Sequence, residues 1–193
     1  VLADTWLAGG FTSTEKCILS PEDVQGQVIR AAGPAFERMM VGAGASITSM
    51  PSSEIYTAMQ TGVLDAASTS SASFVTFRLH EHSVCLTAPG DYGLWFMYEP
   101  VLIGERTWSR LNSDQQAALL AAGQIAEDYF FEQAQLLDQQ LEEVFAEAGV
   151  EVVRMTLEQN EAWRAIAAET SYKVFAEEVP GGAELIEKAL AVE

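Results

Sequence analysis

The strongest hydrophobic pattern in the chain lies between residues 113 and 149. Apolar residues recur there every three or four positions, a Ser113-x-x-Gln116 capping box precedes them, and Gly149 follows. The pattern predicts one helix of about 36 residues, roughly 54 Å long, which exceeds the width of a small domain. A coiled-coil partner would explain such a helix, but the Ala-rich start and aromatic middle fit better with a strut packed across more than one domain.

Before residue 66, short apolar segments alternate with glycine and proline, which is typical of brief strands and helices joined by tight connections. Ser20 and Pro21 suit the start of a helical turn, and the β-branched Val28 and Ile29 lead to Arg30 at the end of a strand. This alternation of short strands and helices predicts an α/β fold with a parallel sheet covered by helices. The elements expected are a strand, a Gly9-Gly10 loop and a second short strand within 1–19, a strand at 28–30, a helix at 34–41, a strand at 46–50 and a helix at 51–62.

Two stretches allow more than one interpretation. The run Ala66 to Ser73 has no charge and no large side chain, so it is a plain loop or a strand end whose hydroxyl groups donate to a ligand; the pattern alone favours the loop. The passage Asp91 to Pro100 is the most aromatic in the chain and suits a core strand or the wall of a binding pocket. Alternation separates Trp95 from the face shared by Tyr92 and Tyr98.

The other expected elements are shorter. A helical pattern begins at Phe74, and Thr156-x-x-Gln159 caps another helix that runs to about Phe175. The remaining elements are a strand at 83–87, a strand at 150–155, a break at 180–182 and a last helix at 183–190.

The charge of the chain limits its partners. With 28 acidic and 10 basic residues the formal net charge is −18, which argues against sequence-independent binding to nucleic acid. A single guanidinium can still bind an anion, because surface charge is screened beyond roughly 8–10 Å. No charge-free run of 18 apolar residues occurs, so we expect a soluble chain with no membrane insertion. It opens on Val1 without a start methionine or signal peptide, so we expect a processed or truncated piece.

Motifs that carry chemistry are few. We find no CxxC, HExxH, GxSxG, GxGxxG or P-loop pattern, and His80 and His82 have the wrong spacing for a helical ligand pair, so we expect no catalytic set, metal or cofactor. Cys17 and Cys85 are the only cysteines and are either bridged or free and buried. Arg30 stands at the carboxyl end of a strand, where open α/β sheets place their ligands, although a salt bridge would also explain it.

Three blocks of this sequence also carry a family resemblance. They are S-P-E-D-V-Q-G-Q-V-I-R at 20–30, P-S-S-E-I-Y-T-A-M-Q-T-G-V-L-D at 51–65 and W-S-R-L-N-S-D-Q-Q-A-A-L-L-A-A-G at 108–123. In this order and spacing they resemble the DctP-type solute-binding subunits of TRAP (tripartite ATP-independent periplasmic) transporters. Each block alone is a weak signal, but the three in order extend the resemblance over essentially the whole chain.

The resemblance implies an α/β fold of the type II periplasmic binding protein kind, of which this chain holds one lobe, the long interdomain helix and parts of the other lobe. It implies a periplasmic protein, not an enzyme, that captures a small organic acid in an interdomain cleft and delivers it to a sodium-driven TRAP membrane permease. The chain is then divided into a ligand-binding lobe (1–90), a crossover strand and bridging helix (91–149) and a C-terminal part that packs back on the body (150–193). An N-terminal lobe is missing, and half of the cleft with it.

The resemblance also assigns binding positions. Arg30 takes the place of the family arginine that grips the ligand carboxylate through a bidentate pair. Thr69 takes a position that is often Asn, Ser70 belongs to the same hydroxyl run, and Ser52 stands two residues before the Glu of the second block. The expected ligand-binding residues are Arg30, Ser52, Thr69, Ser70, Asp91, Tyr92 and Trp95, the last three where the chain crosses between lobes.

Departures from the family pattern bear on the ligand. Gly10 stands where many members carry a second arginine, Ala66 replaces a glycine and Thr69 replaces an asparagine, so we expect a ligand other than the sialic acid that some members bind. The aromatic passage suggests an apolar or aromatic carboxylate. Two alternatives remain: an enzyme whose catalytic residues lie in the missing part, and a sensor or scaffold of the same fold.

Overall fold

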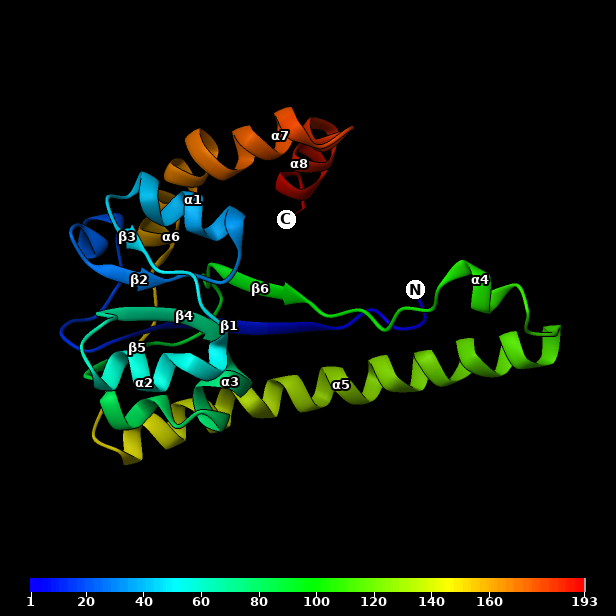
Figure 1. Cartoon of the computed structure of the whole chain (residues 1–193), viewed down its shortest axis with the longest axis horizontal. Helices are drawn as coiled ribbons and strands as arrows, with labels where there is room; N and C mark the ends of the chain where they lie inside the picture. The colour runs from blue at the N-terminus through cyan, green and yellow to red at the C-terminus, as the bar shows by residue number, and fades with distance from the viewer. Residues whose placement is uncertain (193) are drawn as a thin grey trace.

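A mixed seven-stranded sheet forms the centre of the computed structural model, which describes residues 1–192 (Figure 1). The strands lie in the order β3-β2-β4-β1-β5-β7, and β6 pairs with β1 beyond the end of β5. β1 is antiparallel to β4, β5 and β6, whereas the other pairs are parallel. The strands are β1 (Trp6–Ser13), β2 (Val28–Arg30), β3 (Ser46–Ile47), β4 (Ala66–Ser70), β5 (Cys85–Thr87), β6 (Trp95–Tyr98) and β7 (Glu151–Val153).

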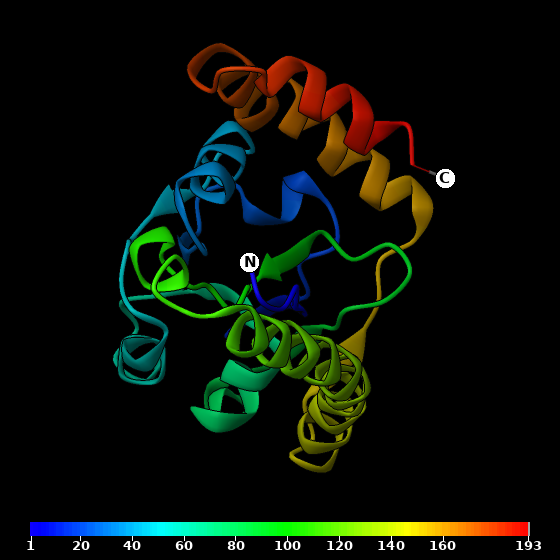
Figure 2. The ribbon, with the colours of Figure 1, turned by 90° about the vertical axis from the view of Figure 1, so that its right-hand side faces the viewer.

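Helices cover both faces of this sheet, as Figure 2 shows. The α-helices are α1 (Pro34–Gly42), α2 (Ile55–Gln60), α3 (Ser71–Thr76), α4 (Glu105–Trp108), α5 (Ser113–Glu147), α6 (Leu157–Ala167), α7 (Lys173–Glu178) and α8 (Gly182–Leu190). The described residues also form short helical turns. Three are 3₁₀ turns, η1 (Pro21–Val24), η2 (Ser52–Glu54) and η3 (Leu79–His82), and one is a π-helical turn, η4 (Ala168–Tyr172).

The sheet separates two hydrophobic cores. On one face α1 and α6 pack against the sheet, and the ring of Phe11 lies 5.9 Å from the rings of both Phe36 and Trp163. On the other face α2, α3 and α5 pack together, with Phe74 and Phe145 edge to face at 6.0 Å. The result is a three-layer α/β body with one hydrophobic core on each face of the sheet.

An arm projects from this body (Figure 1). It consists of residues 1–5 and 99–112 and the amino-terminal half of α5, and Leu2 N–H donates to the Val101 carbonyl at 2.7 Å to join its two extended segments. Gly123 of α5 is needed here, because a side chain at this position would overlap the Leu2 carbonyl. The helix can therefore run along the extended segments at backbone contact distance.

The prediction of a parallel sheet is correct for the βαβ units and wrong for β1. Residues 6–13 form one continuous strand, so the expected loop at Gly9-Gly10 and the second short strand are also wrong. Close packing requires glycine at both positions. A Cβ on Gly9 would overlap the Thr69 carbonyl and the Trp95 ring, and a Cβ on Gly10 would overlap the Thr87 carbonyl. A glycine pair in this sequence marks a crowded central strand instead of a turn.

The hydroxyl-rich run is likewise a strand and not a loop. Ala66–Ser70 is β4, which lies between β2 and β1 with all five residues buried. The Ser70 side chain accepts a hydrogen bond from the Ser73 N–H at 3.2 Å and so caps α3, which begins at Ser71. Small residues suit this strand because helices cover both of its faces closely.

Helix boundaries follow the predictions with small differences. The long helix is confirmed at Ser113–Glu147, but Asn112 and Gln115 form its capping box, one residue earlier than expected. The Thr156 and Gln159 box is confirmed. The helix expected to end near residue 175 continues through the π-helical turn to Glu178.

Cys17 and Cys85 form a disulfide across 68 positions of sequence. The bond ties the segment after β1 to β5, and Cys85 is buried. Of the two states left open by the sequence, the bridged one is therefore observed.

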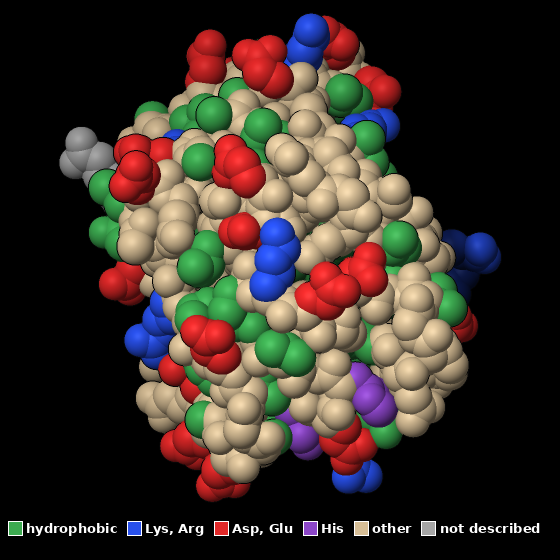
Figure 3. Space-filling model, turned by 90° about the vertical axis from the view of Figure 1, so that its left-hand side faces the viewer, with side chains coloured by type: hydrophobic (Ala, Val, Ile, Leu, Met, Phe, Trp, Pro, Cys, Tyr) green, Lys and Arg blue, Asp and Glu red, His purple; other side chains and the backbone are tan. Residues whose placement is uncertain are grey.

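The surface of the molecule reflects the acidic composition of the chain. Acidic side chains are scattered over the end of the molecule seen in Figure 3, with isolated basic ones among them. Within residues 1–192, no helix is long and apolar enough to span a bilayer.

Where α5 leaves the body, it carries a half-buried carboxyl group. The Asp138 side chain contacts the Ser71 hydroxyl, which also lies 3.2 Å from the Ala8 carbonyl. Burial raises the pKa of Asp138 above its ordinary value, the Ser71 hydrogen bond opposes this, and the Glu142 carboxylate adds to it.

We expect Asp138→Asn to flatten the pH dependence of folding stability. Because the pKa of Asp138 is higher in the folded than in the unfolded chain, its contribution to stability is full at low pH and is lost as pH rises from about 4 through the folded-state pKa. The urea midpoint of the variant, relative to the unchanged protein, should therefore rise between the acidic and the neutral end of this range. Asp128→Asn on the same helix is the control, and an equal midpoint difference at both ends would contradict the assignment.

Candidate functional site

Arg30 ends β2 at the edge of the sheet where the parallel strand β4 also ends. Its Nε donates to the Met50 carbonyl at 3.1 Å and its Nη1 to the Ser68 carbonyl at 2.7 Å. These two bonds fix the plane of the guanidinium between the loop after β3 and the end of β4. No hydrogen bond of Nη2 is found in the described part of the chain, so this side of the guanidinium is available to an anion.

The electrostatics of Arg30 favour an incoming anion. Its side chain is half-buried, and burial lowers its pKa while the charge of Glu37 raises it. Within residues 1–192, no acidic side chain lies within salt-bridge distance of Arg30; the Glu37 carboxylate instead accepts a hydrogen bond from the Ser49 hydroxyl at 2.6 Å. Because an arginine stays charged in proteins, this is a partly desolvated cation that, among the described residues, has the Glu37 charge nearby but no direct ion pair. The salt bridge that the sequence left open is therefore not observed.

Thr69 and Ser70 lie at the end of β4, next to the residue that holds Arg30. Both are buried, and they face Gly10 and Gly9 of β1 across the antiparallel pair. The neighbouring Ser68 is fully buried, and its hydroxyl finds no hydrogen-bond partner. Arg30 pairs with Ala67 of β4, and side chains alternate along a strand, so Thr69 lies on the same face of the sheet as Arg30, whereas Ser68 and Ser70 lie on the other face.

Ser52 and Trp95 border the same region from two sides. Ser52 starts η2 two residues after Met50, whose carbonyl binds Arg30. Trp95 starts β6 opposite Gly9, which in turn pairs with Ser70, so these three residues form one row across neighbouring strands. The buried Trp95 ring covers Gly9 and supplies an apolar wall beside the polar strand end.

Asp91 and Tyr92 are placed differently. They are the two exposed residues of loop 88–94, and the Tyr92 carbonyl accepts a hydrogen bond from the Asn160 side chain of α6 at 3.0 Å. Asp91 lines a cavity of about 450 Å³ together with Asn160 and Arg164. Tyr92 is thereby held to α6, while Ala88 at the start of the loop donates to the Val153 carbonyl of β7 at 2.8 Å.

Gly10 accounts for the absence of a second arginine. In this backbone no side chain fits at position 10, since even a Cβ would overlap the Thr87 carbonyl of β5. Arg30 is therefore not assisted by a cation from β1.

Three contributors could not be identified from the sequence. The carbonyls of Met50 and Ser68 orient Arg30, and the Ser68 hydroxyl is buried without a hydrogen-bond partner in the same strand. Backbone acceptors leave no trace in residue types, because every residue has a carbonyl. Ser68 lies within the hydroxyl run that was noted, but only strand pairing shows which of its members flank Arg30.

The structure is a three-layer α/β body in which, within residues 1–192, the Arg30 guanidinium at the carboxyl edge of the sheet has no salt bridge, an arrangement that suits the binding of an anion. Residues 4–178 match the family model for DctP, described as bacterial extracellular solute-binding protein, family 7. The chain belongs to this family, which confirms the resemblance of the three blocks. The family is one of bacterial extracellular solute-binding proteins.

Individual relatives agree with this assignment. A solute-binding protein of Albidiferax ferrireducens is 37% identical over 181 residues, which are 94% of this chain and 54% of that protein. The crystal structure of a TRAP periplasmic solute-binding protein from Rhodoferax ferrireducens with bound malonate is 35% identical with a TM-score of 0.90, covering 100% of this chain and 63% of that one. One from Roseobacter denitrificans with bound β-D-glucuronate is 25% identical, with a TM-score of 0.88 and 100% and 62% coverage.

These comparisons confirm the α/β fold of TRAP solute-binding proteins. They also show that the chain spans only about half to three fifths of these relatives.

Proposed function

We propose that this chain is one lobe and the connecting helix of a binding protein that captures a small organic acid and delivers it to a TRAP membrane permease driven by a sodium gradient. The observation that carries the proposal is the Arg30 guanidinium, which is partly desolvated, held by two backbone carbonyls and without a salt bridge to any acidic residue between 1 and 192. A carboxylate supplies the missing counter-charge. The malonate and β-D-glucuronate in the two solved relatives are both carboxylates, which supports this ligand class.

The proposed ligand site joins Arg30 to the end of β4. Arg30 binds the carboxylate, the hydroxyl groups of Thr69, Ser70 and Ser52 bind further oxygens, and Trp95 packs against the apolar part of the ligand. Asp91 and Tyr92 are left out of this set, because their loop contacts α6.

The remainder of the cleft is proposed to come from a second lobe. The arm exposes many large apolar side chains that a folded partner would cover. They include Val101, Leu102, Leu120, Ile125, Tyr129 and Phe131, each at least 49% exposed. In this division residues 1–90 form most of the binding lobe, 91–149 bridge the two lobes and 150–193 pack back on the body.

Recovery of the natural ligand tests the function. The complete protein, purified without denaturation, should release a compound with at least one carboxylate on mass spectrometry. Calorimetry with that acid should give one site per chain, while its carboxamide should bind far more weakly because the counter-charge of Arg30 is absent. Release of an uncharged compound, equal binding of the amide, or conversion of the acid into a product would each contradict the proposal.

A further inference from the structure

A second cavity lies away from Arg30, between α1, α6 and the C-terminal helices that Figure 2 shows above the sheet. Its volume is about 340 Å³, within the range of small-molecule sites. The inner wall is apolar and consists largely of Phe36, Met39 and Trp163, with Phe175 and Ile186 closing the side of α7 and α8. Neither Arg30 nor the residues that hold it line this cavity.

Three polar groups of the cavity lack partners within residues 1–192. Ser171 is only 8% exposed, and no hydrogen bond of its hydroxyl is found. No hydrogen bond of the Tyr172 hydroxyl is found either. Arg164, which also lines the cavity, forms no salt bridge with a carboxylate of these residues. Ser171 and Tyr172 belong to the π-helical turn η4, a rare local geometry that often accompanies functional sites.

The apolar cavity adjoins a more polar one. The cavity of about 450 Å³ beside loop 88–94 shares Leu94, Arg164, Tyr172 and Ile186 with it. Asn160 and Asp91 line only this outer part. Among residues 1–192, the combined site therefore has an apolar part, one guanidinium that both cavities share and a more polar part with the Asp91 carboxylate.

We propose that this combined cavity is a second ligand site, which takes a small monocarboxylic acid with an aromatic or branched apolar body. The carboxylate pairs with Arg164 and accepts hydrogen bonds from the Ser171 and Tyr172 hydroxyls, while the apolar body packs between Phe36 and Trp163. A dianion is disfavoured, because the site offers one cation and Asp91 repels a second negative charge. This site is independent of the proposed Arg30 site.

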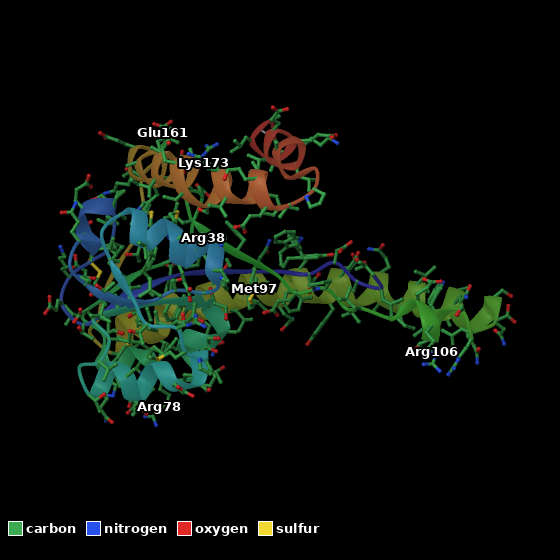
Figure 4. All side chains as sticks on the ribbon, turned by 45° about the horizontal axis from the view of Figure 1, so that its top comes forward. Arg38, Arg78, Met97, Arg106, Glu161 and Lys173 are labelled. Carbon is green, nitrogen blue, oxygen red and sulfur yellow. A yellow bond between two sulfur atoms is a disulfide. The ribbon has the colours of Figure 1, made fainter. Side chains whose placement is uncertain are left out.

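Phenylacetate is a suitable probe, and an Arg30→Ala background silences the first site. Calorimetry on the 193-residue chain should show one phenylacetate site, and Arg164→Gln should weaken it at least tenfold. The control is Arg106→Gln, which changes an arginine at the far end of the arm (Figure 4) and should leave the affinity unchanged. The neutral 2-phenylacetamide should bind at least tenfold more weakly than phenylacetate.

A cavity-filling variant separates this site from the first one. Ala35 is exposed and lines the cavity, so Ala35→Phe should block phenylacetate without disturbing the core and should leave carboxylate binding at Arg30 intact. The proposal is overturned if phenylacetate does not bind the Arg30→Ala chain at millimolar concentration, or if neither Arg164→Gln nor Ala35→Phe weakens it. It is also overturned if Ala35→Phe dissociates a dimer in sedimentation, since a second copy would then occupy the cavity.

Discussion

Replacing Arg30 by alanine in the complete protein should weaken binding of the carboxylate ligand by about 1.5–3 kcal/mol, roughly 10- to 150-fold, the scale of a hydrogen bond to a charged group. The effect is large because Arg30 is the cation at this strand end, and Gly10 leaves no room for a second one on β1. Isothermal calorimetry with the ligand recovered from the native protein measures the change.

Two further variants separate binding from folding. Arg30→Ala also removes hydrogen bonds to the Met50 and Ser68 carbonyls, so its thermal midpoint must be compared with that of the unchanged protein. Arg30→Lys keeps the charge but loses the planar fork, and it should recover only part of the affinity. Arg38→Ala removes an exposed arginine of α1 that pairs with Glu178 at 3.6 Å, and it should bind normally. Unchanged affinity in Arg30→Ala would show that another group anchors the ligand.

Removing the disulfide should destabilise the chain by about 4 kcal/mol, which follows from the loop-closure entropy for 68 positions of sequence separation. The bond constrains the unfolded chain, and in the folded state it holds the segment after β1 against β5. Urea denaturation of a Cys17→Ala, Cys85→Ala double variant should show a lower midpoint than the oxidised protein.

Reduction provides the matched control for this experiment. Dithiothreitol should lower the midpoint of the unchanged protein and have no effect on the double variant, in which no bond remains to be reduced. Equal midpoints for oxidised and reduced protein would mean that the bridge adds nothing to stability. Cys85 is buried, so alanine is preferred to serine in order to avoid burying an unpaired hydroxyl.

The helices were predicted well because their signals are local. The spacing of apolar residues and the capping residues act within one turn of the chain, and α5 and α6 begin within one residue of their predicted starts. The π-helical turn η4 has no comparable local signal. Its residues pack against α1 and α6, so its geometry depends on contacts far along the chain.

The sheet was predicted less well because strand pairing is not local. Gly9-Gly10 has the composition of a turn and Ala66–Ser70 that of a loop, yet they lie in the two central strands and pair with each other. Each needs small residues because of what approaches from the neighbouring strand, such as the Thr69 and Thr87 carbonyls and the Trp95 ring. Local propensity cannot report such an approach.

The sequence by itself determined the helix positions, the strand that ends at Arg30, the acidic character and, through three motif blocks, the family to which the chain belongs. These features depend on residue types and short spacings. The tertiary structure alone decided the antiparallel course of β1, the Cys17–Cys85 bond, the hydrogen bond that joins Tyr92 to α6, and the two carbonyls that orient Arg30. These depend on groups distant in sequence, most of them backbone atoms common to every residue, so they exist only once the strands have paired.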